Sequence, residues 1–448
     1  MMENRENFKN RFTAVMAMAG SAIGLGNIWR FPYMVGQNGG AAFIVVYLLS
    51  AVFLSLPIFL SEAIIGRSTQ KSTFGAMEQL APSSAWKWLG LLTVASPLII
   101  LSYYSVVGGW SIEYLLKSLF FRLDAYPSLS ELSSSSVTPL FFHTAFLLTC
   151  ALVVKGGVSK GIEKFSKITT PLLFVLILVV AAYSVTLPGA SEGVRYLLKP
   201  DFSKLTPEAI MSAMGQSFFS LSLGVGTMLT YASYVSKEEN LLRTSLGTSI
   251  FDLVFAILAG FAIMPAVFAA GMEPGAGPGL IFDTLPFIFG KMGESIPRLT
   301  ELIAMLFFLT VLVSALTSAI SMMETGVAYL IEEKGFNRDK AMVVIFAGCW
   351  TLGLLCSLSF GSLSGVKLMG MTIFGFCDSL ASNILMPLGG MLFTIFVGWK
   401  MSRSQVYEEF TNSGTRSFNK AVFKIVYFLI RYVAPAVILL IFISNLVY

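Results

Sequence analysis

The chain has 448 residues, of which 55% are hydrophobic and only 12% are charged, with a formal net charge of +5. A soluble domain carries about 25% charged residues, so this composition excludes a soluble globular protein and indicates an all-α polytopic membrane protein. Residues 1–11 are polar and no small-residue cleavage site follows the first apolar run, so no cleavable signal peptide is expected. The four cysteines lie within apolar runs, which argues against a disulfide framework and against a zinc site.

Hydropathy read over a window of about 19 residues predicts eleven membrane spans. In chain order they cover 12–35, 41–66, 88–120, 139–155, 163–187, 207–234, 242–270, 297–332, 338–358, 370–400 and 418–447. If the N-terminus is cytoplasmic, most Lys and Arg fall on the cytoplasmic side, as the positive-inside rule requires. We therefore expect a multi-pass protein of the inner (plasma) membrane with a cytoplasmic N-terminus, whose basic charge needs no nucleic-acid partner.

The first and sixth spans are both interrupted by glycine and serine. The interruptions are Gly20-Ser21-Ala22-Ile23-Gly24-Leu25-Gly26-Asn27 and the Ser- and Gly-rich stretch 216–226. Unwound backbone is tolerated at membrane depth only where it lines a cavity or is buried in protein. Two such spans at corresponding places in two halves point to the central site of a transporter. We therefore expect one transporter domain over 1–448, with a first repeat at 12–187, an inverted second repeat at 207–400, and an eleventh helix at 418–447.

A broken helix offers two kinds of binding group at mid-membrane. The free N–H groups at a half-helix N-terminus suit a carboxylate, and the unwound carbonyls suit a hard cation such as sodium. The alternative interpretation is that these small residues only allow close helix packing. The coincidence of two breaks with Asn27, Arg30 and Pro32 in one span favours a binding site.

Several polar side chains lie within the apolar spans. Acidic residues are costly inside a membrane and mark a function or a partner, which makes Glu62, Asp252 and Asp378 candidates, with Asp378 a possible partner for Arg30. Glu324 is closer to a span end, where a packing role is the expectation. In the eighth span, the hydroxyls of 314–318 could be cation ligands, or could simply bond the carbonyls of the preceding turn.

On these motifs the chain resembles a bacterial member of the neurotransmitter:sodium symporter family, over nearly its whole length. The similarity is carried by Arg5, Gly20–Pro32, Asn38-Gly39-Gly40, Glu62 with Gly66-Arg67, Tyr103-Tyr104 with Trp110, Gly161–Lys164, Gln216–Gly226, Tyr231–Tyr234 and Leu316-Thr317-Ser318. The resemblance implies the fold of the bacterial leucine transporter, a 5+5 inverted repeat with helices 1 and 6 unwound.

The resemblance also implies two sodium sites and no organic cofactor. The first site would use the carbonyl of Ala22 and the side chains of Asn27, Ser220 and Asp252. The second site would use the carbonyls of Gly20, Ile23 and Ser314 and the hydroxyls of Thr317 and Ser318.

The implied substrate is a small molecule, an amino acid, held between these sites. Its amino and carboxyl groups would meet Ser21, Ala22, Leu25, Gly26, Tyr104, Phe219, Ser220 and Ser318, and its side chain would meet Ile100, Ser222, Val225 and Met322. Arg30 and Asp378 resemble an extracellular gate pair, and Arg5 and Glu332, with Tyr234, resemble a cytoplasmic gate. The spacing of Gly161 and Pro171 resembles that by which relatives unwind helix 5 and wet the second sodium site.

Charge arithmetic predicts chloride independence. A zwitterionic amino acid adds no net charge, so two sodium ions leave the site at +2, and an ionised Asp252 lowers this to +1. We therefore expect a symporter that imports neutral hydrophobic L-amino acids by alternating access without chloride; proton return through Asp252 is a further possibility. The alternatives are a proton-coupled carrier of the same architecture and a non-transporting amino-acid sensor. No Ser-His pair, Asp pair or His cluster suggests an enzyme.

Overall fold

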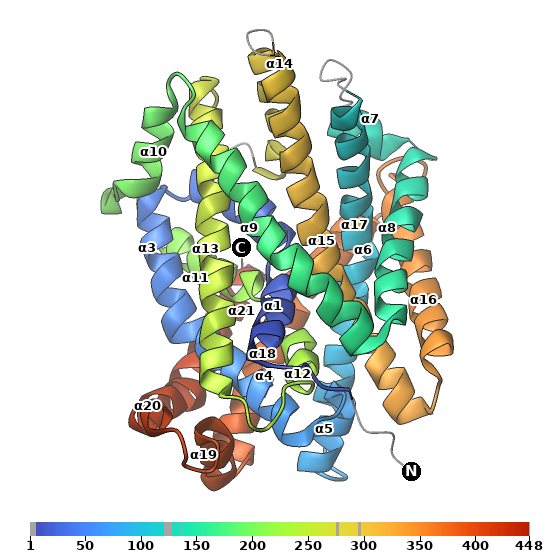
Figure 1. Ribbon diagram of the computed structural model, residues 1–448, viewed down its shortest axis with the longest axis vertical. Helices are drawn as coiled ribbons and strands as arrows, with labels where there is room; N and C mark the ends of the chain where they lie inside the picture. Colours follow the sequence, from blue (N-terminus) through green and yellow to red (C-terminus); the bar gives the residue numbers. More distant parts are fainter. Residues whose placement is uncertain (1–5, 121–127, 136, 275–276, 294–296, 448) are drawn as a thin grey trace.

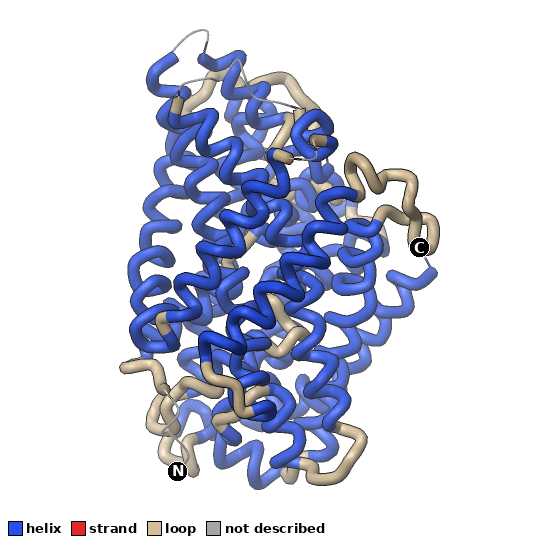
Figure 2. Tube along the Cα trace, turned by 90° about the vertical axis from the view of Figure 1, so that its right-hand side faces the viewer, coloured by secondary structure: helices blue, strands red, loops and turns tan. Residues whose placement is uncertain are grey.

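The computed structural model describes residues 6–120, 128–135, 137–274, 277–293 and 297–447, and these residues form an all-helical bundle (Figure 1). The tube view shows long helices running between the two ends, with loops gathered mainly at the ends (Figure 2). Within the described residues the extended structure is confined to one isolated bridge between Leu368 and Met371.

The helices fall in the order that the apolar runs predict. The α-helices are α1 Arg11–Ala22, α2 Phe31–Gln37, α3 Ala41–Ser50, α4 Leu56–Thr69, α5 Thr73–Leu80, α6 Lys87–Leu119, α7 Leu129–Ser134, α8 Thr138–Lys155, α9 Lys164–Val185, α10 Ala190–Leu198, α11 Pro207–Ser220, α12 Thr227–Ala232, α13 Leu241–Ala269, α14 Thr284–Gly293, α15 Pro297–Lys334, α16 Arg338–Leu358, α17 Ile373–Ser379, α18 Met386–Ile395, α19 Arg403–Thr411, α20 Ser417–Phe428 and α21 Ala434–Val447. Short π-helical turns at 51–55, 380–385 and 429–433 join α3 to α4, α17 to α18 and α20 to α21.

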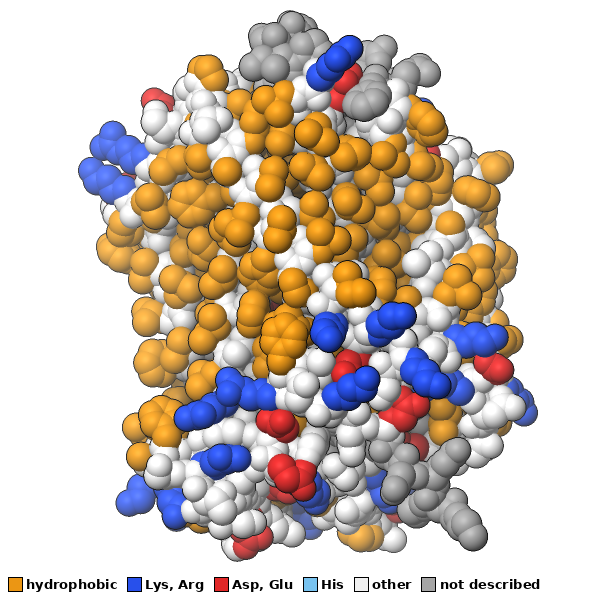
Figure 3. All heavy atoms as spheres, in the orientation of Figure 1, with side chains coloured by type: hydrophobic (Ala, Val, Ile, Leu, Met, Phe, Trp, Pro, Cys, Tyr) orange, Lys and Arg blue, Asp and Glu red, His pale blue; other side chains and the backbone are white. Residues whose placement is uncertain are grey.

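Each predicted span coincides with a helix or a helix pair. Nine helices in the described part of the chain are long and apolar enough to cross a membrane, and the bent pair at 11–37 makes a tenth. The predicted sixth span corresponds to α11 and α12, which six unwound residues separate. The space-filling view shows a broad hydrophobic band, with Lys and Arg concentrated toward the end at which the N-terminus lies (Figure 3). The molecule is a multi-pass membrane protein.

Both predicted interruptions are real breaks. Between α1 and the π-helical turn at 26–30 the chain bends by 55°. The second break needs glycine, because Gly224 and Gly226 adopt φ angles of +81° and +74°, which other residues rarely adopt. A Cβ on Gly224 would also overlap the carbonyl oxygen of Met386 in α18.

The apolar segment 280–289 packs against the bundle at the end opposite the N-terminus (Figure 1). Its buried residue Phe282 makes edge contacts with Trp29 and Trp110, at centroid distances of 6.2 and 5.9 Å. Phe282 also packs on Tyr114 of α6, at 5.2 Å. This element therefore ties the first break to α6 and covers the core above it.

Candidate functional site

Three polar side chains from three helical segments meet beside the first break. Asn27 Nδ2 donates to Ser220 Oγ at 2.8 Å and to Asp252 Oδ1 at 2.7 Å. Ser220 Oγ donates to the other carboxylate oxygen of Asp252 at 2.9 Å. All three residues are at most 1% exposed. The structure thus brings together the side chains predicted for the first cation site, although the π-helical turn at 26–30, α11 and α13 supply them from distant parts of the sequence.

Two further polar groups border this cluster that the sequence reading did not identify. The Tyr47 hydroxyl of α3 donates to Ser220 Oγ at 3.3 Å. Gln216 Nε2 donates to the carbonyl of Gly26 at 2.9 Å, while its Oε1 is buried without a hydrogen-bond partner. A buried acceptor without a partner is costly, so the Gln216 oxygen is available to a bound group. The signal for Gln216 was its place four residues before Ser220, one helical turn away.

The second group of predicted ligands also converges. Thr317 Oγ1 of α15 donates to the carbonyls of Ser314 and Ile23, at 2.9 and 3.3 Å. Ser318 Oγ donates to the carbonyls of Ser21 and Ile23, at 2.9 and 3.2 Å. The hydroxyls therefore bridge α15 to the unwound part of the first span, where carbonyl and hydroxyl oxygens could hold a hard cation.

Gly20 lies against Thr317 of the second group and against Thr170 of α9. A Cβ there would lie 2.7 Å from Thr170 Oγ1 and 3.5 Å from the Cβ of Thr317. Thr170 Oγ1 donates to the carbonyl of Met16 at 2.9 Å, so α9 also borders this group. The π-helical turn Val158–Glu163, which contains Gly161, directly precedes α9.

The predicted substrate residues lie between the two groups. Tyr104 Oη accepts a hydrogen bond from the Leu25 amide at 3.1 Å, and a Cβ on Gly24 would lie 2.8 Å from the Tyr104 hydroxyl and 2.5 Å from the Ser318 hydroxyl. A Cβ on Gly26 would lie 3.2 Å from the Phe219 ring. The Ser21 hydroxyl is buried and has no partner. Of the predicted side-chain subpocket, Val225 and Ser222 lie in the second break, with Ile100 on α6 and Met322 on α15.

Arg30 and Asp378, the residues predicted to form an extracellular gate, do not make a direct ion pair in this structure. The Arg30 guanidinium lies over the Phe219 ring, 4.2 Å from its centroid. Asp378 lies in α17, and no ion pair joins it to Arg30 among the described residues. Arg30 and Phe219 line a cavity of about 450 Å³ that α11, α18 and α21 complete. Ser379, the residue after Asp378, also lines this cavity.

At the N-terminal end, two residues of the predicted cytoplasmic gate, Tyr234 and Glu332, make hydrogen bonds with described residues. Tyr234 donates to Glu324 Oε1 at 2.8 Å, and Arg338 forms an ion pair of 2.5 Å with Glu324 Oε2. Glu332 lies further along α15 and accepts from the Ser72 amide at 2.6 Å. The Glu324 side chain is fully buried, and its contacts with Tyr234 and Arg338 are in line with the packing role expected for it.

The predicted gate residue Arg5 lies outside the described residues. Phe8, three positions later in the sequence, donates its amide to the carbonyl of Tyr234 at 2.9 Å and contacts the Tyr231 and Tyr234 rings.

Glu62 holds the second break in place. Its Oε1 accepts the Gly224 amide at 2.6 Å, its Oε2 has no partner, and the side chain is fully buried in α4. A buried acid that bonds unwound backbone positions the loop without needing a cationic partner. Glu62 thus positions the second break. This contact accounts for the acidic residue within the second predicted span, for which the sequence suggested no partner.

Comparison with known proteins agrees with this geometry. The model of the sodium:neurotransmitter symporter family matches residues 5–138 and 128–448. YhdH of Bacillus subtilis (strain 168), named as a sodium-dependent transporter, is 40% identical and the match covers 96% of this chain and 95% of YhdH. A sodium-dependent transporter of Haemophilus influenzae (strain ATCC 51907 / DSM 11121 / KW20 / Rd) is 34% identical over 99% of both chains.

The structural comparison gives the same class. The crystal structure of MhsT in complex with L-phenylalanine matches with a TM-score of 0.89 and 39% sequence identity, covering 99% of this chain and 100% of MhsT. The fold is therefore that of a helical transporter, with two broken spans and a polar centre between them. The chain belongs to the sodium:neurotransmitter symporter family and is a sodium-dependent transporter.

Proposed function

We propose that this protein imports neutral hydrophobic L-amino acids by sodium-coupled symport, without chloride. The observation that carries the proposal is the buried carboxylate of Asp252, which bonds both Asn27 and Ser220 beside the first break. Asp252 provides a fixed negative charge where a sodium ion and a substrate carboxylate would meet. A mobile anion is then unnecessary.

Two ions fit the donor sets. Carboxylate, amide and hydroxyl oxygens surround the first position, and carbonyl and hydroxyl oxygens surround the second; both sets suit a hard monovalent cation. The residues of the first set would be Ala22, Asn27, Ser220 and Asp252, and those of the second Gly20, Ile23, Ser314, Thr317 and Ser318. Sodium in the first position would bring positive charge next to the substrate carboxylate, so each would raise the affinity of the other.

The amino-acid class follows from the groups between the sites. The Tyr104 hydroxyl and the amides of the first break suit the zwitterionic end. The predicted subpocket of Ile100, Ser222, Val225 and Met322 offers no charge to a substrate side chain. The bound L-phenylalanine of MhsT supports a hydrophobic amino acid. One methylene in such a pocket changes specificity by only about 10- to 200-fold, so we propose a broad range of substrates.

The test is uptake of radiolabelled leucine, tryptophan and alanine by proteoliposomes under an inward sodium gradient, in chloride or gluconate. We expect uptake that needs sodium and is equal in both anions. Uptake that persists without sodium would favour a proton-coupled carrier of the same architecture. Substrate binding without uptake would favour a sensor. A strict chloride requirement would overturn the role of the Asp252 charge.

A further inference from the structure

Four hydroxyls on α13 are buried without any hydrogen-bond partner. They belong to Thr244, Ser245, Thr248 and Ser249, whose exposed fractions lie between 0% and 5%. A buried hydroxyl left without a partner is costly. Four in six consecutive residues of one helix therefore require an explanation in terms of what they bind.

Many other buried hydroxyls on the helices of this protein bond their own preceding turn. Ser61 donates to Pro57, Thr325 to Ser321 and Thr394 to Met391 and Gly390, at distances between 2.8 and 3.2 Å. That is the ordinary behaviour of Ser and Thr in such helices. The hydroxyls on α13 lack this bond, so their polar groups remain available to another partner.

The four hydroxyls share one face of α13 with Asp252. At about 100° per residue, positions 244, 245, 248, 249 and 252 fall within an arc of about 140°, with Asp252 near its middle. At about 1.5 Å per residue, they extend over about 12 Å of the helix axis. This face is buried within the bundle, whereas Arg243, Ile250 and Val254 on the other side are exposed. The hydroxyls thus form a polar stripe that ends at the first cation site.

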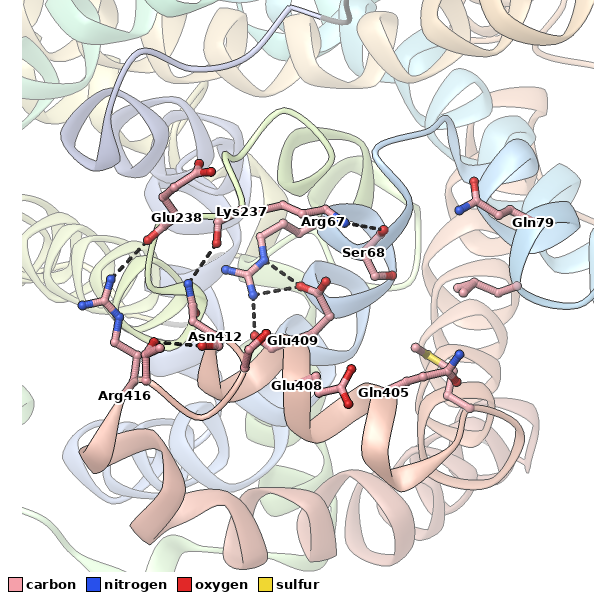
Figure 4. A pocket seen from close by; sticks show the side chains of 14 residues that line it. Arg67, Ser68, Gln79, Lys237, Glu238, Gln405, Glu408, Glu409, Asn412 and Arg416 are labelled. Atoms are coloured by element: carbon pink, nitrogen blue, oxygen red, sulfur yellow. Dashed lines mark hydrogen bonds and ion pairs between the residues drawn. The ribbon is translucent and has the colours of Figure 1, made fainter.

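The other end of the stripe lies one helical turn from the loop that precedes α13, and this loop borders a polar cavity at the N-terminal end of the molecule. Asn240 caps α13, and its carbonyl accepts the Thr244 amide at 3.0 Å. The loop just before it borders a cavity of about 580 Å³ lined by charged and polar groups from α4, α19 and this loop. Figure 4 shows the Arg67–Glu409 pair and the bond from Arg416 to the backbone of Glu238 at its wall.

We propose that the hydroxyls of Thr244, Ser245, Thr248 and Ser249 hold a file of water molecules between this cavity and the first cation site. Buried water commonly satisfies polar groups that the protein leaves unpaired, making about three hydrogen bonds each. A sodium ion beside Asp252 would then exchange protein ligands for water along this face as it leaves toward the N-terminal end. The inference rests on the proposed function, because it assumes that the first site binds sodium.

The decisive variant is Thr244→Val with Thr248→Val, which keeps the shape of both side chains and removes both hydroxyls. Binding and release of ²²Na⁺ by the purified full-length protein are measured by rapid filtration. We expect association and dissociation to slow together by about tenfold, the factor that one net hydrogen bond is worth, with little change in equilibrium affinity. The matched control is Thr394→Val, whose hydroxyl bonds its own helix; it should retain wild-type rates.

Unchanged sodium rates in the double variant would overturn the water file. A second measurement is a structure at a resolution that shows ordered water: water on all four hydroxyls is expected, and hydroxyls bonded to helix carbonyls without water would contradict it. A dry stripe would also make the double variant more stable to heat than wild type, because unsatisfied polar groups are removed. If wild type binds no sodium, or Asp252→Asn binds it equally well, the proposed function itself fails.

Discussion

The two proposed cation sites lie on either side of the first break and are built from different chemistry. Asp252 contributes a full negative charge to the first group. The second group consists of neutral hydroxyls and carbonyls, with Thr317 and Ser318 bridging α15 to the carbonyls of the break. A fixed charge compensates for an ion wherever the rest of the bundle stands, whereas oriented dipoles bind only while their helices are correctly placed. This difference predicts that the first site sets the charge balance, whereas sodium affinity at the second site depends on the conformation of the helices.

The largest effect is expected from removing the charge of the first site. Asp252→Asn keeps the size of the side chain but removes the buried negative charge that would face the sodium ion. We therefore expect sodium-driven uptake in gluconate to fall about 100-fold. Added chloride should restore part of the activity by replacing the missing negative charge. The measurement is proteoliposome uptake in the two anions. The exposed carboxylate variant Asp283→Asn serves as control, and equal loss in both variants would contradict a specific role.

The next effect sharpens the contrast at the second site. Thr317→Val removes one cation-binding hydroxyl without removing charge, so we expect the sodium concentration for half-maximal uptake to rise about tenfold. Chloride should have no influence on this variant. Thr325→Val, on the same helix and with its hydroxyl bonded to Ser321, should leave sodium dependence unchanged. Chloride rescue of Thr317→Val would erase the proposed division between the sites.

A smaller effect is expected at the group that joins both sites. Tyr104→Phe removes the hydroxyl that accepts from the Leu25 amide and lies, like the Ser318 hydroxyl, beside Gly24. The KM for the amino acid should rise about five- to tenfold, the cost of one hydrogen bond, while sodium dependence changes less. Tyr183→Phe, a variant of a half-buried tyrosine outside the site, is the control. A rise in sodium half-saturation with an unchanged KM would place Tyr104 with the ions instead.

The smallest effect concerns how the second site opens. Pro171 in α9 cannot donate a helix hydrogen bond to the carbonyl of Lys167, and the π-helical turn Val158–Glu163 precedes it. Pro171→Ala should stiffen this segment and slow ion release from the second site about two- to threefold. Pro265→Ala in α13 should not do so. Stopped-flow sodium release separates the two variants, and faster release after Pro171→Ala would argue against unwinding of α9 as the opening step.

The sequence by itself determined the helices, the two breaks and the family. Apolar runs long enough for a bilayer must be helical there, because backbone polar groups need internal partners. The Gly and Ser interruptions predicted the breaks, because small residues allow unwound backbone to pack inside the protein at mid-membrane depth. Asn27, Ser220 and Asp252 could be named from the sequence through the family resemblance.

Only the tertiary structure decided which polar groups face one another. Asn27 and Ser220 are 193 positions apart, and their contact depends on how each helix is rotated about its axis, which apolar helices with weak amphipathic patterns do not specify. For the same reason, the sequence did not reveal that Tyr47 and Gln216 border the first site, that Arg338 and Tyr234 share Glu324, or that Phe219 lies under Arg30. The partnerless hydroxyls on α13 became visible only when every neighbouring helix was in place, because an unmet hydrogen bond is a property of the surroundings of a residue.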